Sequence, residues 1–131
     1  MMNFFPGALV ALAVACSCAA HAAEGAPTPA KEVKDVRMVI LHRPGPAWVA
    51  GKSVFEQTGI GAHVQHYRQL LQQGKLAQGG PFLDGSGGMM IARRGANEAE
   101  MKAFAAADPA VQSGLLTFEV KQWLIGMQDG A

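Results

Sequence analysis

The chain has 131 residues, the size of a single domain and too few for two full hydrophobic cores. Its formal net charge is +1, from 11 Lys and Arg against 10 Asp and Glu, and the two signs are interspersed. This pattern gives no basic stripe for nucleic acid, so we expect no nucleic-acid partner.

The first 23 residues contain no Asp, Glu, Lys or Arg, and residues 4–20 are nearly all apolar. The apolar run ends in Ala20-His21-Ala22, which fits the small-x-small pattern that signal peptidase cleaves. Residues 1–22 are therefore predicted to be a signal peptide, and the mature protein is expected to be periplasmic or secreted. One alternative is an uncleaved membrane anchor, although this run is shorter than the ~20 apolar residues of a spanning helix.

A second alternative is a lipidated N-terminus at Cys16 or Cys18, the two cysteines of the chain. Because both lie in the signal segment, the cleaved protein has no thiol, no disulfide and no cysteine metal site. Residues 23–34 are rich in Ala, Pro and charge, and they predict a flexible linker.

The first regular element is expected at residues 36–42, an almost continuous apolar run with β-branched residues that indicates a central strand. Two prolines and a glycine in residues 43–48 predict a loop. Residues 60–73 then place Ile, Val, Tyr and Leu side chains on one face at helical spacing. This pattern predicts a helix that stops at Gly74.

Two short apolar runs, residues 76–83 and 89–94, flank a glycine-rich turn and predict a β-hairpin. Asn97 and Glu100 have the spacing of a capping box and predict a second helix, which should end near Asp108 because proline follows. Residues 116–121 alternate between apolar and polar and predict a half-exposed strand.

The element order is therefore βαββαβ, which predicts an α+β domain with a ferredoxin-like fold and a four-stranded antiparallel sheet over residues 35–126. Residues 127–131 are a tail. Two helices can cover only one face of such a sheet, so the other face needs a partner. We expect that partner to be a second copy of the chain in a homodimer.

The chemistry is expected at His63, which lies about 40° from Tyr67 on the helical wheel and should therefore point at the sheet. A buried imidazole needs hydrogen-bond partners that also control its charge. Asp108 continues the inward stripe of the second helix and is a candidate partner that would orient the ring. The alternatives are a core histidine bonded to a backbone carbonyl, and an Asp108 that only caps a short helical turn beginning at Pro109.

Other residues are weaker candidates. His66 lies about 100° from Tyr67, on the flank of the helix, and could contact a substrate. Trp48, Phe82 and Met90 could line an apolar substrate pocket or simply pack. His63 and His66 are close enough to share a metal ion, but no second ligand cluster is apparent, so no metal site is expected.

The order and spacing of several motifs resemble the YCII-related proteins over residues 36–125. The resemblance rests on His63 in a helix that ends at Gly74 and on a series of short motifs: GKL at 74–76, GGP at 79–81, DGSGG at 84–88, ADPAVQSGL at 107–115 and EVKQW at 119–123. It implies a ferredoxin-like fold that forms dimeric α+β barrels, with an active site of one His and one Asp. Those two residues are His63 and Asp108 here.

Together these features predict a small-molecule enzyme, a lyase or isomerase that needs no cofactor. It would use the His–Asp pair for general acid/base chemistry on a small cyclic or enol-type substrate. The alternative is a non-catalytic periplasmic domain that binds a small ligand or has only a structural role as a dimer.

Overall fold

The computed structural model describes residues 34–130. The expected signal peptide and all of the expected linker except Lys34 lie outside the described residues. Eight elements follow in chain order: β1 (Val36–Pro44), the 3₁₀ turn η1 (Val54–Glu56), α1 (Ile60–Gln72), β2 (Leu76–Pro81), β3 (Gly88–Ala92), α2 (Glu98–Ala106), α3 (Pro109–Gln112) and β4 (Leu116–Leu124).

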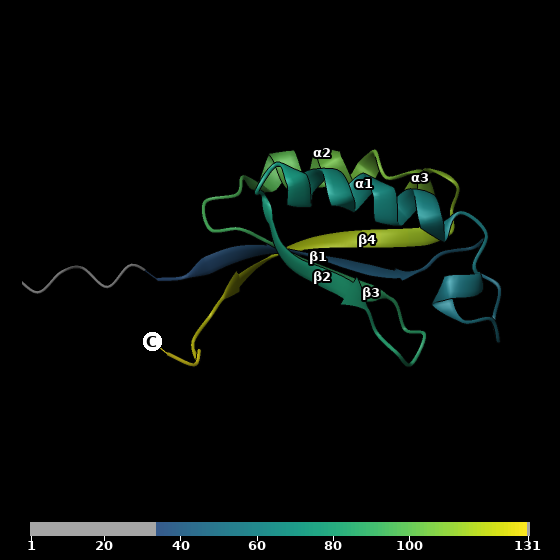
Figure 1. Ribbon diagram of the computed structural model, residues 1–131, viewed down its shortest axis with the longest axis horizontal. Helices are drawn as coiled ribbons and strands as arrows, with labels where there is room; N and C mark the ends of the chain where they lie inside the picture. Colours follow the sequence, from purple (N-terminus) through teal and green to yellow (C-terminus); the bar gives the residue numbers. More distant parts are fainter. Residues whose placement is uncertain (1–33, 131) are drawn as a thin grey trace, which may run out of the picture. The chain divides into compact units, whose positions relative to one another are not determined.

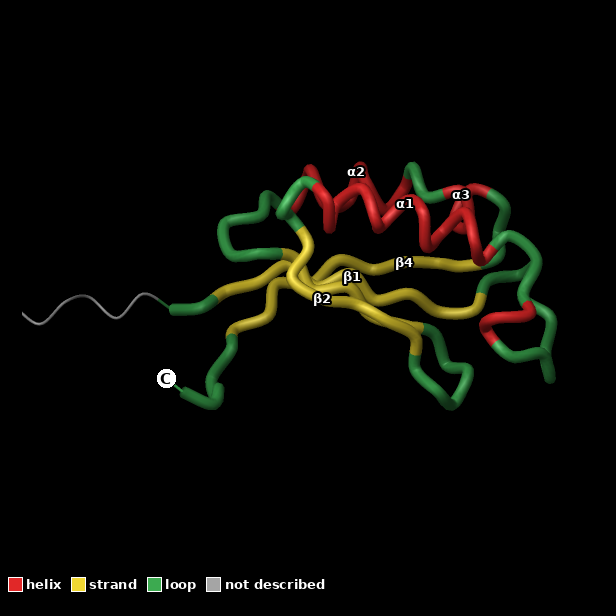
Figure 2. The backbone as a smooth tube through the Cα atoms, viewed as in Figure 1, coloured by secondary structure: helices red, strands yellow, loops and turns green. Residues whose placement is uncertain are grey.

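The four strands form one antiparallel sheet in the order β2-β3-β1-β4. The helices α1, α2 and α3 all lie on one side of this sheet, as Figure 1 and Figure 2 show. Strand β1 therefore runs through the centre, paired with β3 on one side and with β4 on the other. The predicted α+β class and ferredoxin-like topology are confirmed.

Helix α1 ends where the sequence indicated, at a left-handed glycine. Gly74 has a φ of 70°, a conformation that side chains with a Cβ rarely adopt. The amide of Gly74 donates to the Leu71 carbonyl, and the amide of Lys75 donates to that of Leu70. These two bonds satisfy carbonyls of the last turn and direct the chain into β2.

Helices α2 and α3 each begin at a side-chain cap. The carboxamide oxygen of Asn97 accepts from the Glu100 amide at 3.1 Å. Asp108 caps α3, with Pro109 in the first helical turn. Since α2 ends at Ala106, the chain has only two residues in which to turn from one helix to the next. This short connection holds the carboxylate of Asp108 in place under the helical layer.

The core lies between the sheet and the helices. Side chains from β1, β2, β3, α1 and α2 pack against one another there, with Met101 and Ala105 fully buried. The residues of this core are Ile40, Tyr67, Leu70, Leu76, Met90, Ala92, Met101 and Ala105. No helix among the described residues is long and apolar enough to cross a membrane.

Several boundaries differ from those predicted: β2 ends at Pro81 and not at residue 83, and β3 spans Gly88–Ala92 and not residues 89–94. β1 continues through Arg43 and Pro44, because Pro44 sits at the last register position opposite Leu116, where its missing N–H costs little. β4 extends to Leu124, which pairs with Val36 at the other end of β1. The turn η1 was not predicted; the Ser53 hydroxyl accepts from the Phe55 amide, and the Glu56 carboxylate accepts from the Ser53 amide.

Candidate active site

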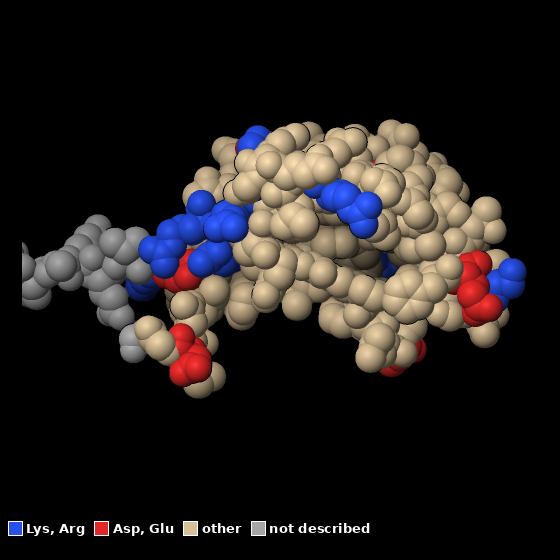
Figure 3. Space-filling model, viewed as in Figure 1, with Lys and Arg blue, Asp and Glu red and all other residues tan. Residues whose placement is uncertain are grey.

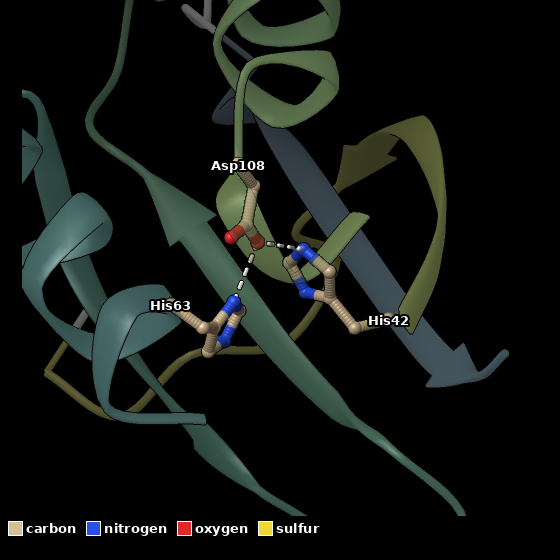
Figure 4. A group of neighbouring side chains, drawn as sticks. All are labelled: His42, His63 and Asp108. Atoms are coloured by element: carbon tan, nitrogen blue, oxygen red, sulfur yellow. Dashed lines mark hydrogen bonds and ion pairs between the residues drawn. The ribbon is translucent and has the colours of Figure 1, made fainter. Parts of the chain in front are cut away.

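The two side chains expected to form the site lie in contact. His63 comes from the first turns of α1 and Asp108 from the cap of α3, and their side chains approach each other in Figure 4. His63 Nδ1 lies 2.6 Å from Asp108 Oδ2, and both residues are buried. The other carboxylate oxygen, Oδ1, accepts from the Ala110 amide at 2.9 Å. Asp108 therefore caps α3 and engages His63 at the same time, one oxygen for each role.

The carboxyl group of Asp108 is held in its charged form. Burial by itself would raise its pKa, but the hydrogen bonds from His63 and from the Ala110 amide, with the charges of His63 and His42, outweigh burial and lower the pKa. An ionised carboxylate can only accept hydrogen bonds. Nδ1 of His63 is consequently the protonated nitrogen, and Nε2 is left to exchange protons.

A third member of the site, His42, was not identified from the sequence. It lies on β1 with its side chain 2 % exposed, and its Nε2 is 3.9 Å from Asp108 Oδ2 (Figure 4). A sequence signal did exist, because His42 follows Ile40 at the two-residue period of a strand and so faces the helices with it. The run was read as a continuously apolar strand, which hid this alternation.

His42 is tied to the site through Tyr67. Its Nε2 lies 3.0 Å from the Tyr67 hydroxyl, and its ring meets the His63 ring edge-on at a centroid distance of 4.9 Å. Burial, and then the charge of His63, lower the pKa of His42 to about 4. Burial also raises the pKa of Tyr67, as does the Asp108 charge. Both groups are therefore neutral near pH 7, and the site contains one carboxylate and one basic nitrogen that remains available, Nε2 of His63.

The Nδ1 atom of His42 is buried and has no hydrogen-bond partner among the described residues. Such an atom costs free energy unless something pairs with it. The hydroxyl of Tyr67 nevertheless fixes the ring through Nε2, so the orientation of Nδ1 is fixed as well.

His63 and His42 form part of the wall of a cavity of about 360 Å³. Trp48 and Met90, two of the predicted substrate-binding residues, also line it. Phe82 does not; it lies just beyond the end of β2 and is 38 % exposed. The cavity is lined mainly by apolar side chains and by the glycines of the β2-β3 hairpin.

His66, expected on the helix flank with a possible substrate contact, is turned away from the cavity. Its Nε2 donates to the Phe104 carbonyl at 2.7 Å, and its ring stacks on the Phe104 ring at 4.0 Å. These contacts hold α1 against α2. The position of His66 thus supports a packing role, and nothing in it supports the expected contact with a substrate.

The sequence suggested His63 and His66 as the pair to consider for a metal ion, whereas the structure brings a different group of possible ligands together. Within the described part of the chain, His42, His63 and Asp108 each offer one ligand atom, all within 4.8 Å of one another. Two imidazoles and a carboxylate are a donor set that transition metals accept. Here, however, His63 Nδ1 bonds directly to Asp108, and His42 Nε2 bonds to Tyr67. A metal ion bound to these two nitrogens would therefore have to displace the His63–Asp108 hydrogen bond and the His42–Tyr67 hydrogen bond.

Comparison with known proteins gives a matching family and a similar solved structure. The sequence model of the YCII-related domain matches residues 36–124. A comparison with curated protein sequences found no match. Among solved structures, 5-chloro-2-hydroxyhydroquinone dehydrochlorinase (TftG) from Burkholderia phenoliruptrix AC1100, in complex with 2,5-dihydroxybenzoquinone, is 22 % identical to this chain. The match covers 66 % of this chain and 92 % of that one, with a TM-score of 0.49.

Proposed function

The chain belongs to the YCII-related domain family, and we propose that it is a small-molecule enzyme in which His63 transfers a proton and Asp108 orients it. The reaction class is that of a lyase or isomerase that needs no cofactor, acting on a small cyclic or enol-type substrate. The observation that carries the proposal is the 2.6 Å contact between His63 Nδ1 and Asp108 Oδ2, made by a histidine that also lines a cavity of about 360 Å³.

The geometry supports a defined proton path. Nε2 of His63 has no hydrogen-bond partner among residues 34–130, and it can take a proton from an acidic C–H or O–H of a bound molecule. The ring then becomes an imidazolium whose Nδ1–H still donates to the Asp108 carboxylate, which stabilises the new charge. Return of the proton to another atom of the substrate gives an isomerisation. Its delivery to a leaving group gives an elimination.

His42 and Tyr67 support this path by remaining neutral. A second protonated imidazole at 3.9 Å would compete with His63 for the charge of Asp108. Because its pKa is about 4, His42 carries no charge at neutral pH. The carboxylate of Asp108 therefore stabilises only the imidazolium of His63.

Hydrogen–deuterium exchange tests the proposal without requiring knowledge of the product. A panel of small cyclic enolisable ketones and dihydroxylated rings is incubated with the protein in D₂O, and loss of the C–H signals is followed by NMR. His63→Gln should slow the exchange of any responsive compound by about 10²–10⁴-fold, the usual contribution of a general base. Asp108→Asn should have a similar effect, because an amide that donates to Nδ1 moves the ring proton to Nε2.

His66→Gln is the matched control, since it changes an imidazole of the same helix that does not line the cavity. It should leave the exchange rate unchanged. Melting temperatures separate loss of chemistry from loss of fold. A folded His63→Gln protein that exchanges the same compounds at the wild-type rate would rule out His63 as the base.

A non-catalytic ligand-binding domain is the second candidate, because the cavity is largely apolar and an apolar pocket of this kind can bind a small molecule whether or not a reaction follows. In that case no compound of the panel would exchange above the protein-free rate. His63→Gln would also retain the affinity of any compound that binds.

We further propose that the protein is exported and works as a homodimer. The support for a dimer is the sheet face opposite the helices, where Leu41 of β1 lies opposite Met89 of β3 and both side chains are only half-buried in the single chain. Light scattering of the purified protein should give twice the chain mass, and Leu41→Glu should reduce it to one. Mass spectrometry of the protein secreted by its host should show a chain that begins at Ala23.

A further inference from the structure

We propose that the cavity takes a small ring compound bearing one negative charge, with Arg68 at the cavity wall as the residue that binds the anionic group. This inference rests on the proposed function, because it concerns the same cavity. It adds a substrate class and a specificity residue.

The first observation is the charge of the cavity wall. Among the described residues that line it, Arg68 is the only Lys or Arg, and there is no Asp or Glu. Asp108 is 0 % exposed and does not line the cavity, and its two carboxylate oxygens are bonded to His63 Nδ1 and to the Ala110 amide. A molecule in the cavity therefore meets one permanent charge, and that charge is positive.

The second observation is that Arg68 makes no hydrogen bond or ion pair with any residue that the structure describes. Basic residues elsewhere on the helical side do: Lys102 pairs with Glu98, and Lys75 with Glu100. Arg68 is the only Lys or Arg of α1, and Figure 3 shows basic atoms over this helix beside a hollow in the surface. A guanidinium presents a planar fork of donors that matches a carboxylate or an acidic ring oxygen.

The third observation is the rest of the wall, which fits a flat apolar body. Trp48, Phe55, Leu71 and Met90 contribute apolar surface, and Gly79 contributes backbone without a side chain. The volume is about 360 Å³, and a closed cavity of ~150 Å³ is known to hold a benzene ring. The space is therefore ample for a single substituted ring.

The proposed base, His63, and the proposed anion-binding residue, Arg68, both lie on α1. Arg68 follows His63 by five residues, which is about 7.5 Å along the helix axis and about 140° around it, so the two side chains reach the cavity from different flanks of α1. A ring whose anionic group bonds to Arg68 can therefore extend towards Nε2 of His63. Arg68 would thus set which ring atom faces the base, as a specificity residue that takes no part in proton transfer.

Benzoate and benzamide are suitable probes, because they have nearly the same shape and differ in charge. Their affinities are measured by NMR titration at low and high salt for the wild-type protein, Arg68→Gln, Arg68→Lys and Arg93→Gln. Arg93 is an exposed arginine that does not line this cavity, so its replacement makes the same change in net charge elsewhere. Sulfate is included as an anion without a ring.

We expect the wild-type protein to bind benzoate about tenfold more tightly than benzamide at low salt, the usual advantage of a charge-assisted bond at a partly exposed site. The preference should disappear in Arg68→Gln and persist in Arg68→Lys and Arg93→Gln. Equal affinity for the two probes in the wild-type protein, or a preference that survives in Arg68→Gln, would overturn the proposal. Sulfate binding as tight as benzoate binding would also overturn it, because the ring would then contribute nothing.

These outcomes are independent of the proton-transfer proposal. His63→Gln should retain the preference for benzoate although it loses exchange activity. If the preference is absent but His63→Gln still abolishes exchange, the substrate class is wrong and the general base stands. If the preference is present and nothing exchanges, the cavity binds anions without catalysis.

Discussion

Replacing His42 by leucine and Tyr67 by phenylalanine in one protein should make the fold less sensitive to acid. The paired change removes the imidazole and its hydroxyl partner together, so neither is left unsatisfied in the interior. In the wild-type protein the pKa of His42 is about 4, against an ordinary value of 6.5. Because the folded state resists protonation, its stability is fully present above pH 6.5 and declines as the pH falls towards 4.

The size of this effect follows from the two pKa values. The difference between 6.5 and about 4 corresponds to about 3 kcal/mol in the free energy of unfolding. Between pH 7 and pH 4.5 the wild-type protein should lose about 2 kcal/mol through His42 alone. The groups that face this imidazole are His63, Asp108, His66 and the Tyr67 hydroxyl. Asp108, whose folded pKa is lowered, contributes its own loss at more acidic pH, below its ordinary value of 3.8.

Urea unfolding followed by circular dichroism at pH 7, 6, 5 and 4.5 measures the effect for both proteins. The double variant should lose about 2 kcal/mol less than the wild-type protein over this range. The comparison cancels every group that titrates in the same way in both proteins. If the two proteins lose stability in parallel, His42 is not held neutral by its burial, and the reasoning about the site's single charge is wrong.

Two further predictions concern packing around the site. Met101→Ala should lower the free energy of unfolding by about 2–5 kcal/mol in urea denaturation, because this side chain is 0 % exposed in the central core. Gly87→Ala should cost about 1–3 kcal/mol or more, since the new Cβ would lie 1.9 Å from the His42 carbonyl oxygen at a φ of +130°. Gly61→Ala, in open space on α1, is its control and should raise the melting temperature slightly; a Gly87→Ala protein as stable as that control would contradict the assigned backbone.

Much of the fold was readable from local pattern. Periodicity placed α1, the hairpin and the last strand, because each buries one face against a single neighbouring layer. Caps were readable for the same reason: Asn97 and Asp108 act on amides two or three residues away. The sequence could not predict boundaries that depend on a distant partner strand. The extension of β1 to Pro44, which pairs with Leu116, is an example.

The sequence could predict a site residue where the periodicity of its own helix or strand fixes the direction of its side chain. The wheel position of His63 indicated that it points inward, and the stripe of the second helix did the same for Asp108. The direction of His66 could not be settled this way, because a position on the helix flank leaves both outcomes open. The carbonyl of Phe104, 38 residues along the chain, decided it.

The amino-acid sequence by itself therefore determined the order of the elements, their amphipathic faces and the two residues of the pair, because these depend on spacing within a few turns of chain. Tertiary structure alone decided that His42 and Tyr67 join that pair, and that Arg68 lines the cavity without a described partner. The physical reason is that hydrogen bonding, burial and the resulting charge states depend on distances between elements, which no local period encodes.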